Sequence, residues 1–284
     1  MATIEANGIE IYYEEHGSGE PLLLIMGWGG NTATWNPQIE GLAKHFRVIA
    51  FDNRGVGRTS APEGPYTMSQ MACDVVGLLD GLDVPRTHVF GISMGGMVAQ
   101  ELAIEHPERI DTLILGCTTP GSSRAAGMAQ LRNDISTFRD ANGKQDLEWI
   151  SEFLRRLWTE EAMTKSTPEL QDFVLSIIRF PPTSHGLIHQ ADAVGAHDAH
   201  DRLGQIPHRT LVMTGAEDTL IDPKNSEILA ELIPDAKLVV FEGLRHAFHL
   251  ERPALANDAI INFIHRTDRE TKADSTRERV EDTA

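Results

Sequence analysis

The stretch THVFGISMGG, residues 87–96, decides the fold of this chain. Its first five residues have the β-branched and aromatic composition of a strand, and the residues from Met94 to Glu105 have the apolar spacing of a helix. Between the two lies Gly91-Ile92-Ser93-Met94-Gly95, with the pattern Gly-x-Ser-x-Gly. A turn this tight needs glycines where neighbouring backbone approaches, and it strains its central residue. We therefore predict that Ser93 stands at the tip of a strand-to-helix turn with its hydroxyl facing solvent.

The same alternation of strand and helix runs through most of the chain. Compact apolar runs are separated by segments with helical spacing, which predicts an α/β fold with a parallel sheet covered by helices. The strand-like runs are LLLIM (22–26), RVIAF (47–51), TLILG (112–116), RTLVMTG (209–215) and KLVVFEG (237–243), and the helical segments include 68–82, 223–232 and 253–265. Near the start, Asn7-Gly8 has the turn chemistry of a hairpin, so an antiparallel edge is expected to begin the sheet.

Residues 119–206 interrupt this alternation. They contain no strand-like run but several stretches with helical spacing, which predicts an inserted helical cap. The chain then divides into an α/β core of residues 1–118 and 207–266 and a cap of residues 119–206. Residues 267–284 mix both charge signs and hold almost nothing apolar. We expect them to form a disordered tail, because such a segment buries too little surface to offset the entropy of ordering.

Composition excludes several classes of partner. The formal net charge is −17, which disfavours binding to nucleic acid or to an anionic membrane and leaves a small neutral or apolar molecule as the expected ligand. Cys73 and Cys117 are too few for a disulfide framework, and we interpret both as small buried hydrophobes in a reducing compartment. The first residues lack the basic and apolar pattern of a targeting segment, so a cytoplasmic protein is expected.

A serine hydroxyl is a weak nucleophile, so a base is expected near Ser93 and an acidic group is expected to orient that base. His246 follows the strand-like run 237–243 and is the predicted base; His249 is the alternative. Asp218 follows the run 209–215 and is the predicted acid. The alternatives for the acid are Glu217 and Asp222, and Asp222 is better placed to cap the helix that begins at Pro223. All three predicted groups follow separate strands, at the sheet edge where ligands bind in open α/β folds.

These segments resemble the α/β-hydrolase superfamily over about residues 3 to 266. The matching segments are LLLIMGWGG (22–30), FDNRGVGRTS (51–60), GISMGG (91–96), TGAEDTLIDP (214–223) and GLRHAFHLERP (243–253). The resemblance implies a mostly parallel eight-stranded sheet with helices on both faces and a helical cap. It also implies an oxyanion hole made by the backbone N–H groups of Met94, at the start of the helix, and of Trp28, with Gly29 as the alternative to Trp28. No cofactor is implied.

Two positions depart from the pattern of the family. The loop after the run 22–26 usually begins with His-Gly, and this chain has Met26-Gly27 there, which removes a side chain that braces the loop. Arg245 stands where glycine often precedes the catalytic histidine, and we expect its side chain to be solvent-exposed. The expected substrate-binding residues are Trp28 and Met26 on the loop, with Trp149 and Trp158 in the cap.

Two further patterns are set aside. The segment FDNRGVGRTS lacks the lysine of a phosphate-binding P-loop, so Asp52 and Arg54 are interpreted as groups that hydrogen-bond neighbouring loops. Histidines and aspartates gather in the segment 185–201, but their spacing matches no metal-binding motif, so no metal site is predicted.

The predicted activity is hydrolysis of a carboxylic ester through an acyl-enzyme on Ser93. Serine at the turn argues against a resemblance to the dehalogenase and epoxide hydrolase branches of the superfamily, which need a carboxylate nucleophile. Enol-lactone hydrolysis, thioester hydrolysis and carbon–carbon bond cleavage use similar catalytic groups and stay open. A ligand receptor built on the same fold is the alternative from another class. The sequence leaves both a monomer and a homodimer open.

Overall fold

The fold centres on one mixed sheet in the computed structural model, which describes residues 2–121, 124–140, 147–266 and 277–281. The strands lie in the order β1-β2-β4-β3-β5-β6-β7-β8-β9. β2 pairs antiparallel with β1 and with β4, and the other pairings are parallel. The strands are β1 (Ala2–Ala6), β2 (Ile9–His16), β3 (Pro21–Ile25), β4 (Arg47–Phe51), β5 (Thr87–Ile92), β6 (Ile110–Gly116), β7 (Thr210–Gly215), β8 (Ala236–Phe241) and β9 (Arg277–Val280). The predicted α/β class with an antiparallel first edge is confirmed.

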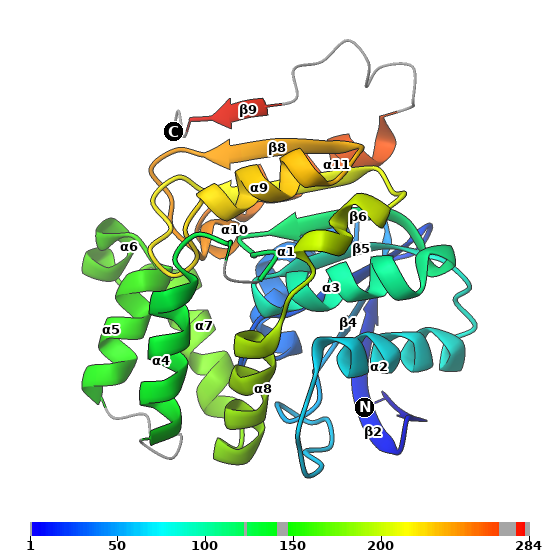
Figure 1. The fold of residues 1–284 in the computed structure, drawn as a ribbon, viewed down its shortest axis with the longest axis horizontal. Helices are drawn as coiled ribbons and strands as arrows, with labels where there is room; N and C mark the ends of the chain where they lie inside the picture. The colour runs from blue at the N-terminus through cyan, green and yellow to red at the C-terminus, as the bar shows by residue number, and fades with distance from the viewer. Residues whose placement is uncertain (1, 122–123, 141–146, 267–276, 282–284) are drawn as a thin grey trace.

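Helices cover both faces of this sheet (Figure 1). One face packs against α2 (Met68–Gly81), α3 (Met94–Glu105) and α9 (Lys224–Leu232), and the other packs against α1 (Asn36–Leu42), α10 (Phe248–Glu251) and α11 (Pro253–His265). Side chains of β3 alternate between the two layers: Leu23 and Ile25 join the first and Leu22 and Leu24 the second, all without exposed surface. The continuous apolar run follows from burial on both faces, as in other parallel sheets.

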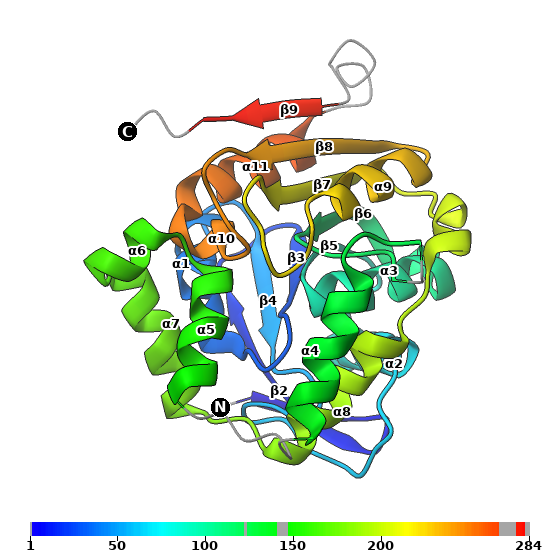
Figure 2. The same ribbon diagram turned by 60° about the vertical axis from the view of Figure 1, so that its left-hand side comes forward.

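Five helices lie between β6 and β7 in the described part of the chain. They are α4 (Met128–Asp140), α5 (Leu147–Leu157), α6 (Glu160–Lys165), α7 (Pro168–Arg179) and α8 (Ser184–Ala196). Figure 2 shows α5, α6 and α7 grouped on one side and α4 with α8 on the other. Short 3-10 helices η1 (Thr32–Trp35), η2 (Pro107–Arg109) and η3 (His200–Gln205) complete the fold. None of the helices within the described ranges combines the length and apolar character needed to cross a lipid bilayer.

The sheet has nine strands rather than the expected eight, because part of the predicted disordered tail forms β9 at the edge beyond β8 (Figure 1). That prediction was wrong for residues 277–280, and residues 267–276 and 282–284 lie outside the described residues. Side-chain pairs join β9 to its neighbours: Lys237 lies 2.9 Å from Glu278 and Arg279 lies 2.7 Å from Glu242. Val280 packs against the second apolar layer. The segment is therefore ordered because it pairs with β8, although its own composition does not favour an ordered structure.

Candidate active site

Ser93 stands at the junction of β5 and α3 in a strained conformation, with φ 55° and ψ −118°. Residues other than glycine rarely adopt a positive φ, so the surrounding structure must hold this turn in place. The Ser93 N–H donates to the carbonyl of Gly116 at 2.8 Å, and the Thr118 hydroxyl donates to the carbonyl of Ser93 at 2.7 Å. A side chain at Gly95 would collide with the carbonyl of Ile25, which explains why glycine follows the turn. The Ser93 side chain is half-buried at the carboxyl edge of the sheet.

His246 and Asp218 form a hydrogen-bonded pair. The two residues follow β8 and β7, and Nδ1 of His246 lies 2.7 Å from Oδ2 of Asp218. The other carboxylate oxygen, Oδ1, accepts from the N–H groups of Leu220 at 2.8 Å and Ile221 at 2.9 Å. Both residues are buried. An ionised Asp218 can accept a hydrogen bond from Nδ1–H of His246, which leaves Nε2 of the neutral ring as a proton acceptor.

The loop after β3 passes directly over Ser93. A Cβ placed on Gly27 would lie 3.2 Å from Cβ of Ser93 and 3.8 Å from its Oγ. Trp28 is the next residue on this loop, and Met94 is the first residue of α3, where helical N–H groups have no partner within the helix. The N–H of Gly29, the alternative oxyanion donor, is already engaged, because it donates to Oε1 of Gln190 at 3.0 Å.

The alternatives for the base and the acid lie in other environments. His249 is buried among Trp35, Phe90 and Phe248, and burial, helped by nearby His246, lowers its pKa to about 3. Glu217 is exposed. Asp222 accepts from the N–H of Lys224, the first residue of α9, at 2.9 Å, but it lies one residue before the N-cap position, which Pro223 takes.

Cys117, at the end of β6, is a neighbour of His246 that the sequence did not reveal. Its Sγ lies 3.5 Å from Nε2 of His246. Burial, with the Asp218 carboxylate nearby, raises the pKa of this thiol well above its usual value. Cys117 is buried as expected, but Cys73 is exposed, so that part of the interpretation was wrong. The available signal was position, because Cys117 directly follows β6, and β6 lies next to β5, the strand that precedes Ser93.

The expected substrate-binding tryptophans fall into two clusters. Trp28 contacts the rings of Trp149 and Phe153, with centroids 6.0 and 5.7 Å away, and those two rings stack at 5.0 Å. Trp158 has no exposed surface and lies in a buried cluster that also contains Ala247. Met26 is buried in the core layer behind the loop. The structure therefore brings Trp149 to the loop beside Ser93, whereas Trp158 lies beside the loop that carries His246.

Arg245 is not solvent-exposed, contrary to the expectation. Its side chain is 20% exposed, and its guanidinium donates to the carbonyls of Arg155 at 2.6 Å and Trp158 at 3.0 Å. These carbonyls lie at the end of α5, where a helix leaves unpaired acceptors. Arg245 therefore joins the cap to the loop that carries His246.

Two groups of side chains within the described ranges offer ligand atoms close enough to hold a metal ion. Cys117, Asp218 and His246 form one group, but its atoms already make the hydrogen-bonded chain described above. Cys73, Glu105 and His106 form the other, at the surface. One histidine of the segment 185–201 joins an ion-pair cluster: buried His197 lies 3.4 Å from Glu101. Arg202 also pairs with that carboxylate, at 2.7 Å. Burial opposes the ionisation of Glu101, but the neighbouring His197 and the hydrogen-bonded Arg202 outweigh it and lower its pKa to about 2.

Comparison with known proteins defines the class. Residues 20–253 match the alpha/beta hydrolase fold family. The chain therefore belongs to the alpha/beta hydrolase fold family.

Similar proteins carry several hydrolase names. A protein from Azorhizobium caulinodans called "Putative carbamate hydrolase RutD" is 32% identical over 89% of this chain and 94% of its own length. The 3-oxoadipate enol-lactonase 2 of Acinetobacter baylyi is 30% identical, over 91% of this chain and 94% of its own. Among solved structures, a hydrolase from Pseudomonas aeruginosa is 30% identical with a TM-score of 0.83, covering 93% of this chain and 98% of that one. A thermophilic esterase from Thermogutta terrifontis is 27% identical with a TM-score of 0.81, covering 95% and 98%. These likenesses establish a hydrolase and leave the bond that it cleaves open.

Proposed function

We propose that this hydrolase cleaves a carboxylic ester of a small neutral or apolar substrate through an acyl-enzyme on Ser93. The observation that carries the proposal is the pairing of His246 with Asp218 at 2.7 Å, at the same edge of the sheet as a serine held in a strained turn. Such a turn presents a nucleophile, and such a pair supplies a base with a fixed tautomer. Burial of both members of the pair supports a preorganised site, since a low dielectric strengthens their interaction.

In the proposed reaction, Oγ of Ser93 forms a bond to the carbonyl carbon of the substrate while Nε2 of His246 accepts the hydroxyl proton. The electron pair of the carbonyl moves to its oxygen, which the N–H groups of Met94 and Trp28 stabilise. The intermediate then collapses, and the leaving alcohol takes the proton from His246. Water repeats the sequence on the acyl-enzyme and releases the acid, and Asp218 stabilises the imidazolium in both halves.

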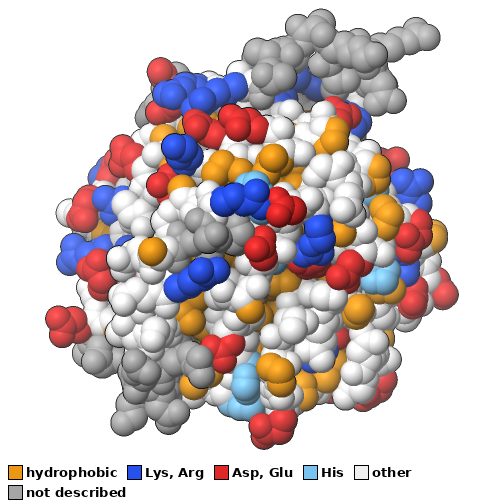
Figure 3. Space-filling view, viewed as in Figure 1, with side chains coloured by type: hydrophobic (Ala, Val, Ile, Leu, Met, Phe, Trp, Pro, Cys, Tyr) orange, Lys and Arg blue, Asp and Glu red, His pale blue; other side chains and the backbone are white. Residues whose placement is uncertain are grey.

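The surroundings of the loop support an apolar substrate. Trp28, Trp149 and Phe153 form a partly exposed aromatic cluster, and buried Leu187 of α8 adjoins it. Acidic and basic side chains are interspersed on the face shown in Figure 3. That arrangement and the net charge of −17 favour a neutral ligand over a polyanion. The expectations of a cytoplasmic location and of a metal-free, cofactor-free protein stay predictions.

Lactone hydrolysis is the second candidate, because one relative and one similar solved structure are named enol-lactonases. The same groups serve both reactions, since a lactone differs from an ester only in that its leaving oxygen stays tethered to the acyl group. Relatives named for carbamate hydrolysis make a carbamate a necessary third test compound. A receptor without turnover remains the alternative from another class.

The test is a panel of p-nitrophenyl esters of increasing chain length, with lactones, a thioester and a carbamate, comparing the wild type with Ser93→Ala. We expect ester turnover that falls by about a thousandfold or more in Ser93→Ala. Preferential turnover of a lactone would replace the ester assignment with the second candidate. Equal activity of both proteins would remove Ser93 as nucleophile, and tight binding without turnover would favour a receptor.

A further inference from the structure

Gln190 of α8 joins the cap to two loops of the core. The side chain has no exposed surface, and both of its polar ends are paired. Its Oε1 accepts from the N–H of Gly29 at 3.0 Å, and its Nε2 donates to the carbonyl of Arg54 at 2.8 Å. A buried amide with a donor at one end and an acceptor at the other has only one satisfied orientation. Gln190 is therefore held in a single position.

The Gly29 peptide that Gln190 holds is next to the expected oxyanion donor. Gly27 lies against Ser93, and Trp28 lies between Gly27 and Gly29. The indole of Trp28 donates to the carbonyl of Leu187, also on α8, at 2.9 Å. Two hydrogen bonds to α8 thus constrain the same short stretch of loop.

The position of α8 is itself fixed by close backbone packing. A side chain at Gly186 would collide with the carbonyl of Gly55, so the first turn of α8 lies directly on the loop after β4. The Thr183 hydroxyl caps this turn by accepting from the N–H of Gly186 at 3.0 Å. A helix seated by backbone contact gives Gln190 a rigid base.

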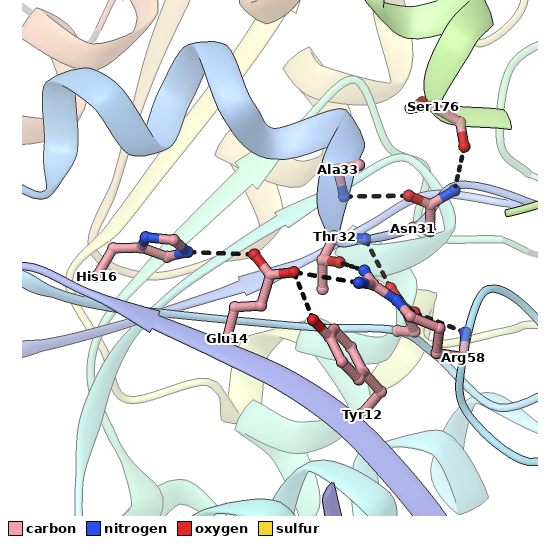
Figure 4. Close-up of polar contacts among 9 residues, drawn as sticks. Tyr12, Glu14, His16, Asn31, Thr32, Ala33, Arg58 and Ser176 are labelled. Atoms are coloured by element: carbon pink, nitrogen blue, oxygen red, sulfur yellow. Dashed lines mark hydrogen bonds and ion pairs between the residues drawn. The ribbon is translucent and has the colours of Figure 1, made fainter. Parts of the chain in front are cut away.

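Other side chains brace both ends of the loop. Asn53 donates to the carbonyl of Met26 at 2.9 Å. At the far end, Asn31 donates to the carbonyl of Ser176 on α7 at 3.1 Å, and the Thr32 N–H donates to Asp52 at 2.6 Å (Figure 4). The Met26 side chain has no hydrogen-bond donor with which to hold the loop. Between these two ends, Gly29 and Trp28 are held by α8.

We propose that Gln190 is a positioning residue that sets the Trp28 N–H in the oxyanion hole, so that a helix of the cap forms part of the catalytic apparatus. This inference rests on the proposed function. Without Gln190, the Gly29 N–H and the Arg54 carbonyl lose their buried partners, and the loop must shift to satisfy them. A shift of about 1 Å at a catalytic group lowers turnover roughly a hundredfold.

The experiment compares Gln190→Leu and Gln190→Glu with the wild type and with Gln171→Leu as a matched control. Gln171 lies on α7 and is exposed, and its side-chain amide donates to the carbonyl of Ser166. We measure kcat and KM on the best p-nitrophenyl ester, the inhibition constant of an alkylboronic acid, and hydrogen exchange at the Gly29 amide. The boronic acid forms a tetrahedral adduct with Ser93 and so reports on the oxyanion hole.

For Gln190→Leu we expect kcat to fall about 10- to 100-fold with KM within about threefold, and the boronic acid to bind correspondingly more weakly. Exchange at the Gly29 amide becomes faster. Gln190→Glu keeps an acceptor for that amide, so we expect its kcat and boronic acid affinity to lie between those of Gln190→Leu and the wild type. Gln171→Leu should have the wild-type values.

Unchanged kcat and boronic acid affinity in Gln190→Leu would overturn the proposal. So would a loss of activity explained entirely by a smaller fraction of titratable active sites, because Gln190 would then serve folding alone. If Gln190→Leu does not fold, Gln190→Glu is judged by the same criteria. If the wild type itself turns over no substrate, the proposed function fails, and exchange at Gly29 alone decides whether Gln190 holds the loop.

Discussion

The thiol of Cys117 lies 3.5 Å from Nε2 of His246, the ring nitrogen that would take the proton of Ser93. A thiol is a weak hydrogen-bond donor, and the raised pKa of Cys117, caused by burial and by the nearby Asp218, keeps this one protonated. A weak partner occupies Nε2 at rest without competing strongly with the serine hydroxyl. Cys117 thus contacts Nε2 of His246 weakly enough that this nitrogen would still be able to accept the proton of Ser93.

A hydroxyl at position 117 should slow the reaction. Cys117→Ser places a stronger donor near Nε2, which stabilises the resting state, so we expect kcat on esters to fall about 5- to 20-fold. Cys117→Ala should stay within about threefold of the wild type. The control is Cys73→Ser, since Cys73 is exposed on α2. A Cys117→Ser enzyme as fast as Cys117→Ala would contradict the competition at Nε2.

Removing the charge of Asp218 should abolish most activity and leave the fold intact. In Asp218→Asn the side-chain oxygen still accepts from the N–H groups of Leu220 and Ile221, but the amide no longer favours the reactive tautomer of His246. We expect kcat to fall by about 10³ to 10⁴ with a similar thermal midpoint. Asp222→Asn is the matched control and should retain activity. Comparable losses in the two variants would argue against Asp218 as the orienting acid.

Local sequence pattern was sufficient to predict the strands and helices of the core, but it could not predict contacts between distant segments. The helix predicted over 68–82 forms over Met68–Gly81, because its apolar spacing and its buried face coincide. The partners of Gln190, in contrast, are Gly29 and Arg54, more than a hundred residues away. Arg245 finds Arg155 and Trp158 in the same way. Such contacts depend on how α5 and α8 dock, which no local pattern encodes.

β9 is another element that local sequence does not predict, because contacts with distant residues stabilise it. Its only apolar residue is Val280, so its order depends on pairing with β8 and on ion pairs such as Arg277 with Glu227 at 2.8 Å. A chain ending after Arg266 should therefore lose only about 1 kcal/mol, which lowers the thermal midpoint by about 2–4 °C, and keep its activity. It should also aggregate more readily, because the edge of β8 is uncovered. A chain ending after Glu281 is the control, and an equal loss in both would mean that β9 contributes nothing.

The buried His249 should make the fold sensitive to acid. Burial and nearby His246 lower the pKa of its imidazole from 6.5 to about 3, so between these values the unfolded chain binds a proton that the folded chain does not. The stability that comes from keeping His249 neutral is therefore fully present above pH 6.5 and is lost as the pH falls toward 3, by roughly 1 kcal/mol per pH unit. His249→Leu removes this dependence, and the hydrogen bond from Gln38 to the backbone carbonyl at this position is retained. Urea unfolding of both proteins at pH 7.5, 6 and 5 measures the effect: the free energy of unfolding of the variant should gain on that of the wild type as the pH falls. A constant difference across the three pH values would mean that His249 takes up its proton equally in both states.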